Sequence, residues 1–138
     1  MKTVIYNGLN DHAIEVRKKV FVEEQGFHDE FDEIDKTASH IIFFDEEKPV
    51  AVCRVFWDPA MNSYILGRLA VLKEYRGRNL GSDMVREAEK HVLEKGGNSI
   101  ALHAQCRVTA FYRSLGYGEY GEIEDDEGCP HIWMKKSL

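Results

Sequence analysis

The sequence predicts a single α/β (α+β) domain in which helices cover a mixed β-sheet. Runs of β-branched and aromatic residues alternate with stretches whose apolar residues recur at helical spacing, the pattern of a sheet with helices packed on it. The 138 residues contain no internal repeat and no linker rich in Pro, Gly or Ser. A chain of this length can bury a sizeable core of its own. We therefore expect one domain over residues 1–138.

The N-terminal half begins with an expected strand at residues 2–6, followed by a helix that Asn10 or Asp11 can cap. The apolar residues of this helix recur every three or four positions as far as about residues 24–26. Three strands are then predicted to form an antiparallel meander, at residues 39–45, 50–57 and 63–71.

The C-terminal half is expected to contain a long helix, a strand, a short helix and two final strands. The long helix has one apolar stripe, formed by Leu80, Met84, Ala88 and Val92, and it is expected to end at the two glycines at 96–97. The remaining elements are predicted as a strand at 99–104, a helix at 108–115, and strands at 117–122 and 131–135. An acidic turn is expected between the last two strands.

Composition excludes several classes of function. Eighteen Lys and Arg against 24 Asp and Glu give a net charge of -6, whereas nucleic-acid binding needs clustered basic residues. The longest apolar runs, at 41–44 and 50–53, fall far short of the roughly 20 residues of a membrane span. Three cysteines without short spacing indicate free thiols. We expect a cytoplasmic protein, because residues 1–6 lack the features of a secretory signal.

A chemical signal lies in the loop at residues 71–82, between a predicted strand and the long helix. A strand that turns into a helix start directs several N–H groups at one point, where the helix dipole also favours an anion. Gly77 and Gly81 allow a ligand to approach the backbone, and Arg76 and Arg78 add positive charge. The loop therefore predicts a pyrophosphate site; the alternative is a tight turn with solvated arginines.

This loop resembles the R/Q-x-x-G-x-G/A motif of the GCN5-related N-acetyltransferase (GNAT) superfamily, which follows a strand ending in Leu-x-Val. The motif positions here are Arg76, Asn79 and Gly81, and the strand ends in Leu69-Ala70-Val71. Asn79 replaces the usual glycine, but Asn tolerates left-handed backbone angles, so the loop can keep its shape. Neither a P-loop nor a dinucleotide-binding motif can be found here.

A second segment supports the resemblance. Residues 105–117 resemble the superfamily's later pattern N-x-x-A-x-x-F-Y-x-x-x-G-F, with Gln105 at the Asn position, Val108 at the Ala position and Tyr117 at the Phe position. The chain is further similar to the ElaA/YjcF-like branch of small bacterial acetyltransferases in residues 17–25, 33–35, 40 and 128–134.

The resemblance implies a mostly antiparallel sheet, splayed at its middle and flanked by about four helices. It implies transfer of an acetyl group from acetyl-CoA to a primary amine of a small molecule by direct attack, without a metal, in a monomer or homodimer. A backbone N–H near the strand end would polarise the thioester. The cofactor-binding residues that it implies are Leu69, Ala70, Val71, Arg76, Gly77, Arg78, Asn79, Leu80, Gly81, Ser82, Gln105, Phe111 and Tyr112.

Three residues are candidates for catalysis. Tyr112 can act as general acid toward the departing thiolate; the alternative is an aromatic core residue. His131, like His40, could reach a cleft and titrate near neutral pH, or be structural. Residues 29–35 hold five acids in seven positions, which predicts a negative mouth for a cationic amine, with Glu33 as the first candidate for the base. The alternative for this segment is a solvated loop.

Two other classes of function remain open. A non-catalytic acyl-CoA-binding or sensing module is compatible with the departure at Asn79, but a pure binder has no need of a phenol such as Tyr112 beside the thiol. A metal-dependent enzyme would require a cluster of His and carboxylates, and the six histidines show no such spacing.

Overall fold

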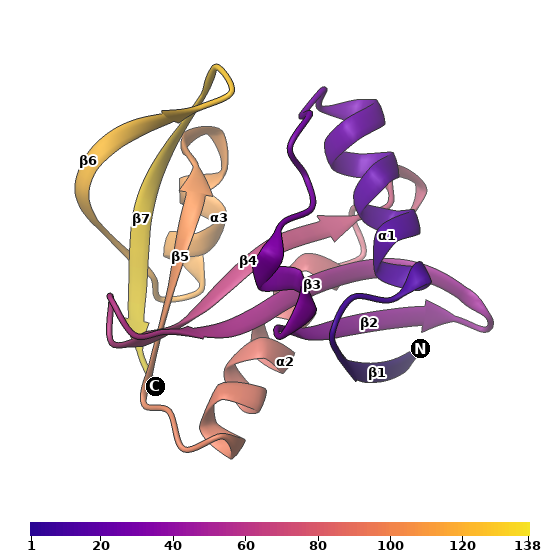
Figure 1. Cartoon of the computed structure of the whole chain (residues 1–138), viewed down its shortest axis with the longest axis horizontal. Coiled ribbons are helices and arrows are strands. Elements are labelled where there is room, and N and C mark those ends of the chain that lie inside the picture. Colours follow the sequence, from indigo (N-terminus) through magenta and orange to yellow (C-terminus); the bar gives the residue numbers. More distant parts are fainter.

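The computed structural model describes residues 1–138 and contains one seven-stranded sheet with the order β1-β2-β3-β4-β5-β7-β6 (Figure 1). Neighbouring strands are antiparallel except for β4 and β5. The strands are β1 (Lys2–Asn7), β2 (Ser39–Asp45), β3 (Lys48–Asp58), β4 (Ser63–Val71), β5 (Ser99–Gln105), β6 (Gly118–Asp126) and β7 (Cys129–Ser137). The helices are α1 (Asp11–Arg17), α2 (Leu80–Glu94) and α3 (Thr109–Ser114).

The first helix begins as predicted, because the Asn10 side chain accepts a hydrogen bond from the N–H of Ala13 at 3.0 Å. The α1 helix continues without a break into a π-helix, Lys18–Glu24. Its buried apolar side chains are Ala13, Val16, Val20 and Phe21. The helices α1 and α2 lie on opposite sides of the sheet in Figure 1. Their buried side chains belong to one continuous core, which the side chains of the strands connect.

The sheet is splayed at its middle, as predicted. The parallel strands β4 and β5 pair only over Tyr64–Leu66 and Ile100–Leu102, and beyond this stretch they separate (Figure 1). Helix α2 forms the crossover that a parallel pair requires. The backbone at residues 67–71 and 103–105 therefore lacks a neighbour on the side of the splay and can face a ligand.

A β-bulge bends β4 at this position. Arg54 pairs with Gly67 and Val52 pairs with Ala70, so that Arg68 and the residue after it lie opposite a single residue of β3. Arg68 has φ 53°, in the left-handed region, which costs a non-glycine residue roughly 1–2 kcal/mol. The bulge turns the end of β4 away from β5.

Two expectations about the elements were wrong in detail. Strands β6 and β7 are longer than predicted, and the expected acidic turn contains only Glu127 and Gly128. Cross-strand pairing with β7 overrides the low strand propensity of the acids before that turn. Three α-helices flank the sheet instead of about four, and short 3₁₀ segments lie at residues 33–36, 73–75 and 106–108.

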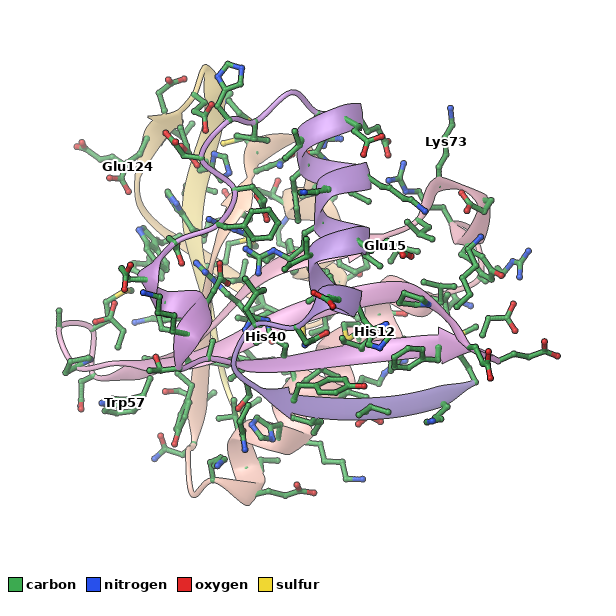
Figure 2. All side chains as sticks on the ribbon, turned by 45° about the vertical axis from the view of Figure 1, so that its right-hand side comes forward. His12, Glu15, His40, Trp57, Lys73 and Glu124 are labelled. Carbon is green, nitrogen blue, oxygen red and sulfur yellow. The ribbon has the colours of Figure 1, made fainter.

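Some side chains of the strands take no part in the core. In Figure 2, Trp57 and Glu124 lie at the periphery, whereas His40 lies in the interior. His40 is 1% exposed, and its Nε2 lies 2.9 Å from the main-chain oxygen of Asp35, so we assign it a structural role. None of the helices combines the length and the apolar character needed to cross a membrane.

Candidate active site

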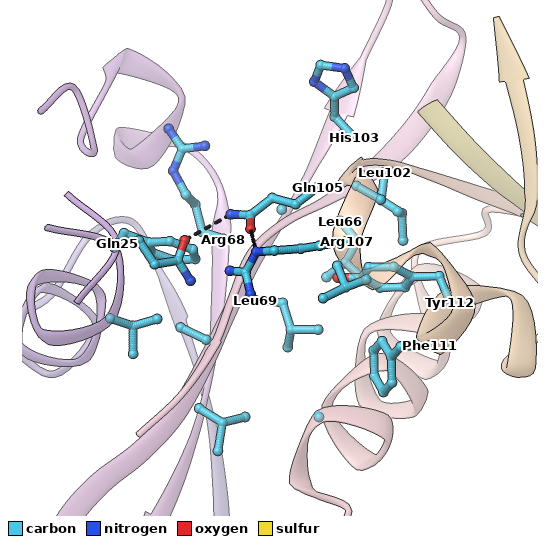
Figure 3. A pocket seen from close by; sticks show the side chains of 18 of the residues that line it. Gln25, Leu66, Arg68, Leu69, Leu102, His103, Gln105, Arg107, Phe111 and Tyr112 are labelled. Atoms are coloured by element: carbon cyan, nitrogen blue, oxygen red, sulfur yellow. Dashed lines mark hydrogen bonds between the residues drawn. The ribbon is translucent and has the colours of Figure 1, made fainter. Parts of the chain in front are cut away.

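A cavity of about 570 Å³ lies at the splay (Figure 3). Its lining comes from both separated strands, from the loop before α2, from α3, from the end of the first helix and from the tip of the β6–β7 hairpin. Segments far apart in sequence therefore meet around it. Of the residues predicted for the site, those in the lining are Leu69, Ala70, Val71, Arg76, Gly77, Asn79, Leu80, Gly81, Ser82, Gln105, Phe111, Tyr112 and His131.

The loop before α2 has the backbone shape of an anion cradle. Asn79 adopts φ 62° and ψ 17°, the left-handed conformation expected of the residue at this motif position, and Gly77 has φ 82°. The N–H groups of Leu80, Gly81 and Ser82 belong to the first turn of α2, where no intrahelical acceptor exists. They lie at the positive end of a 15-residue helix dipole, and all three residues line the cavity.

The arginines of this loop are already engaged within the protein. Both terminal nitrogens of Arg76 donate to the Glu24 carboxylate, at 2.6 and 2.8 Å, and its Nε donates to the Val71 carbonyl at 3.0 Å. The hydrogen bond from Arg76 lowers the pKa of Glu24. Arg78 stacks on the ring of Tyr75 at 4.8 Å and lies outside the cavity lining. The cradle is therefore built chiefly from backbone.

Gly81 leaves room for Phe111 at the start of α2. A Cβ atom at Gly81 would lie 3.4 Å from Cζ of Phe111, which leaves no space for a larger side chain on that side. Phe111 in turn packs edge to face against Tyr112, with ring centroids 5.0 Å apart. The predicted helix that carries these two aromatic residues thus meets the cradle.

Tyr112 is 9% exposed, and the little surface that it keeps borders the cavity. Burial raises the pKa of its phenol above the ordinary value, and no hydrogen-bond partner within the chain contributes to the shift. A phenol in this state keeps its proton throughout the neutral range and can donate it. The position is compatible with both of its predicted roles, core packing and proton donation.

Gln105 ends β5 and spans the splay. Its side-chain nitrogen donates to Oε1 of Gln25 at 2.9 Å, and its side-chain oxygen accepts from Nε of Arg107 at 2.8 Å (Figure 3). A carboxamide has two donor hydrogens and two acceptor lone pairs, so one of each remains for a ligand. The amide links the end of the first helix to the end of β5.

Two histidines lie side by side on the wall formed by β5 and β7. The rings of His131 and His103 are 5.0 Å apart, and His103 stacks on Trp133 at 4.7 Å. Burial, and next the nearby His131, lower the pKa of His103. Nδ1 of His131 lies 2.8 Å from the Cys129 carbonyl oxygen, which can only accept, so Nδ1 carries the proton. In the neutral ring, Nε2 of His131 then holds a free lone pair.

The structure does not bring Glu33 to this cavity. Its carboxylate is 87% exposed and pairs with Lys36. Asp32 and Asp35 also lie outside the lining, paired with Arg54 and, in the case of Asp35, Arg17 as well. Burial alone would raise the pKa of Asp35, but the hydrogen bonds from the arginines outweigh it and hold that pKa well below its usual value.

Only two acids of the segment at residues 29–35 reach the cavity, Asp29 and Glu30. The other acids in the lining are Glu24, Asp126 and Glu127. The carboxylate of Glu127 accepts hydrogen bonds from the N–H groups of His28 and Asp29, at 3.0 and 3.1 Å. Of the five acids expected at the mouth, Asp29 and Glu30 therefore line it, whereas Asp32, Glu33 and Asp35 do not.

The family model of the acetyltransferase (GNAT) domain matches residues 6–138, almost the entire chain. The chain belongs to the GNAT acetyltransferase family. Among relatives, the uncharacterized N-acetyltransferase YjcF of Bacillus subtilis is 35% identical over 127 residues, which cover 90% of this chain and 89% of YjcF. The resemblance found in the sequence is confirmed, and the protein is a GNAT N-acetyltransferase.

Solved structures with the GNAT fold agree with the architecture. The crystal structure of Escherichia coli ElaA has a TM-score of 0.88 and 23% identity, and the match covers 99% of each chain. An aminoglycoside 6'-N-acetyltransferase, solved in complex with coenzyme A, has a TM-score of 0.77 and 18% identity, and the match covers 99% of this chain and 97% of that one. At these sequence identities, the two solved structures show that this chain shares their fold.

Several cavity residues of this GNAT protein were not singled out from the sequence. His103 lies two positions before Gln105 on β5, and the alternation of a strand places both on one face, so this signal was present. Arg68 had no comparable signal, because a bulge places it. Glu30 was among the acids expected at the mouth, but its ion pair with Arg68 gave no signal in the sequence. Glu127 was expected only as part of the acidic turn between the last two strands.

Proposed function

We propose that this GNAT protein transfers an acetyl group from acetyl-CoA to the primary amine of a small molecule. One observation carries the proposal: the cradle before α2, the unpaired strand ends and the Tyr112 phenol border a single cavity. A pyrophosphate fits the cradle, because backbone N–H groups and a helix N-terminus supply the donors that phosphate oxygens need. The unpaired backbone of β4 and β5 offers hydrogen bonds to an extended pantetheine arm.

In the proposed reaction the neutral amine attacks the thioester carbon, a C–N bond forms and the C–S bond breaks. A backbone N–H at Leu69–Val71, beside the bulge, would stabilise the negative charge on the carbonyl oxygen. Tyr112 would donate its proton to the departing thiolate, and Nε2 of His131 would take a proton from the amine. Glu30 is a weaker candidate for the base, since Arg17 and Arg68 already pair with its carboxylate.

A cationic acceptor follows from the charges at the mouth. Asp29 and Asp126 both border the cavity, from the loop before residue 33 and from the hairpin tip, which meet where Glu127 accepts hydrogen bonds from that loop. A negative mouth raises the local concentration of cations and orients them. We therefore expect spermidine and putrescine to be better acceptors than the singly charged tyramine, and glutamate to be the poorest of these four amines.

The assignment of the cradle can be tested by calorimetric titration with acetyl-CoA. The wild-type protein should bind acetyl-CoA, and Gly81→Leu should weaken binding at least about tenfold, because the new side chain has to displace Phe111 or enter the anion site. Gly118→Leu is the matched control, since a Cβ there meets nothing within 4 Å.

Equal affinity in the wild type, Gly81→Leu and Gly118→Leu would place the coenzyme elsewhere. No detectable heat for the wild type at millimolar acetyl-CoA, together with no thermal shift, would exclude the proposed function altogether.

A further inference from the structure

The loop at residues 27–32, named the wall loop here, borders the cavity but contains neither helix nor strand. Its conformation therefore depends on side chains from other parts of the chain. The carboxylate of Glu127 holds its first half through the N–H groups of His28 and Asp29. The second half begins at Glu30, which is 4% exposed.

Arginines hold the second half of the wall loop. The main-chain oxygen of Glu30 accepts from Nη2 of Arg17 at 2.9 Å and from Nε of Arg68 at 3.1 Å. The Glu30 carboxylate lies 2.8 Å from Nε of Arg17 and 3.2 Å from Nε of Arg68. Asp32 accepts from Arg54 at 2.6 and 3.1 Å, and Nη2 of Arg68 lies 3.5 Å away. With Asp35, three guanidinium groups face three carboxylates.

Arg68 differs from Arg17 and Arg54 because its backbone borders the cavity. Arg17 and Arg54 lie outside the cavity lining, and both are almost completely buried. Arg68 forms the bulge of β4 itself and borders the cavity, with its side chain on the same side as Gln25 in Figure 3. Its positive φ is an unfavourable conformation for an arginine, and such a conformation persists where the surroundings fix it.

We propose that Arg68 is a positioning residue for acyl transfer. Its backbone shapes the bulge that orients the thioester, and its guanidinium fixes the wall loop, which faces the acceptor, relative to that bulge. One residue thus sets the distance between the two substrates. This inference rests on the proposed function, and it assigns to Arg68 a role that neither cradle binding nor proton transfer requires.

The test compares Arg68→Gly with Arg68→Lys. Glycine keeps the left-handed backbone without strain and removes the guanidinium, whereas lysine keeps the charge but cannot contact Glu30 and Asp32 with a planar fork. For Arg68→Gly we expect KM for the best acceptor among spermidine, putrescine and tyramine to rise about tenfold and kcat to fall about tenfold, because misplacement by about 1 Å costs up to 10²-fold. The dissociation constant of acetyl-CoA should change less than about twofold. Arg68→Lys should lie between Arg68→Gly and the wild type.

Amide hydrogen exchange gives a readout that needs no acceptor. Exchange at residues 30–32 should accelerate about tenfold in Arg68→Gly and stay at the wild-type rate in the core strands. Arg86→Met is the control, because Arg86 is an exposed arginine of α2 that pairs only with Asp83 three residues before it. It should leave exchange and both kinetic constants unchanged.

Wild-type kinetics and wild-type exchange in Arg68→Gly would overturn the inference. A general acceleration of exchange together with weaker binding of acetyl-CoA would also overturn it, because it would show a merely structural arginine. If the wild-type protein itself acetylates none of the amines, the proposed function fails, and this inference fails with it. That result is recognised without any variant.

Discussion

Replacing Tyr112 by phenylalanine is expected to lower kcat by about 10²- to 10⁴-fold, the usual range for a positioned proton donor. The affinity for acetyl-CoA should change little, because donation to the thiolate acts mainly in the transition state. Burial raises the pKa of the phenol, which favours its neutral form. The wild-type rate should therefore show no alkaline decline near pH 10, where an ordinary tyrosine loses its proton. Steady-state kinetics from neutral to alkaline pH measure both effects.

Tyr117→Phe is the matched control for this prediction. Tyr117 is a second buried phenol, whose hydroxyl donates to Glu89 at 2.8 Å outside the cavity lining. Its removal should lower stability through the lost hydrogen bond and leave kcat within about threefold of the wild type. A kcat of Tyr112→Phe equal to that of the wild type, under conditions where chemistry limits the rate, would assign Tyr112 to the core.

Replacing His131 by alanine is expected to lower kcat by about 10²-fold or more, because the amine then loses the group that accepts its proton. The neutral tautomer fixed by the Cys129 carbonyl gives this expectation its geometric basis. Since the substitution empties the position of the ring, added imidazole should restore part of the rate. Assays of kcat with and without imidazole measure this.

His12→Ala is the control for His131→Ala, because His12 is exposed and lies outside the cavity lining. Imidazole should have no effect on its rate or on that of the wild type. If His131→Ala keeps the wild-type kcat, a different group or the solvent removes the proton from the amine.

The elements could be predicted from the sequence where local patterns determine them. The strands at residues 39–45 and 63–71 are rich in apolar and β-branched residues and lie between polar turns, and the structure has the same bounds. The strand at Gly118–Asp126 could not be bounded in this way, because cross-strand pairing extends it through an acidic stretch of low strand propensity.

The residues of the cavity likewise divide into those that local patterns predict and those that long-range contacts place. The motif predicted the shape of the loop before α2, because Asn79 and Gly77 act through their own backbone angles. The assignment of charge to the mouth was wrong for Asp32, Glu33 and Asp35, which lie outside the lining. The sequence shows five acids together but not the arginines from α1, β3 and β4 that pair with Asp32 and Asp35. Glu33 pairs with Lys36 at the surface instead. Ion pairs between residues 13 to 38 positions apart leave no local signal.

The most direct test of the central claim is an acetyl-CoA-dependent assay with spermidine, putrescine, tyramine and glutamate, in which thiol release is followed and the products are identified by mass spectrometry. Acetylated amine should form with thiol release above the rate of acetyl-CoA hydrolysis, fastest for the polycations. Their advantage should fade as salt rises, since exposed charges are screened over about 8–10 Å at physiological ionic strength. Tight binding of acetyl-CoA without acetylation of any of these amines would contradict acyl transfer to them and favour a non-catalytic acyl-CoA-binding module.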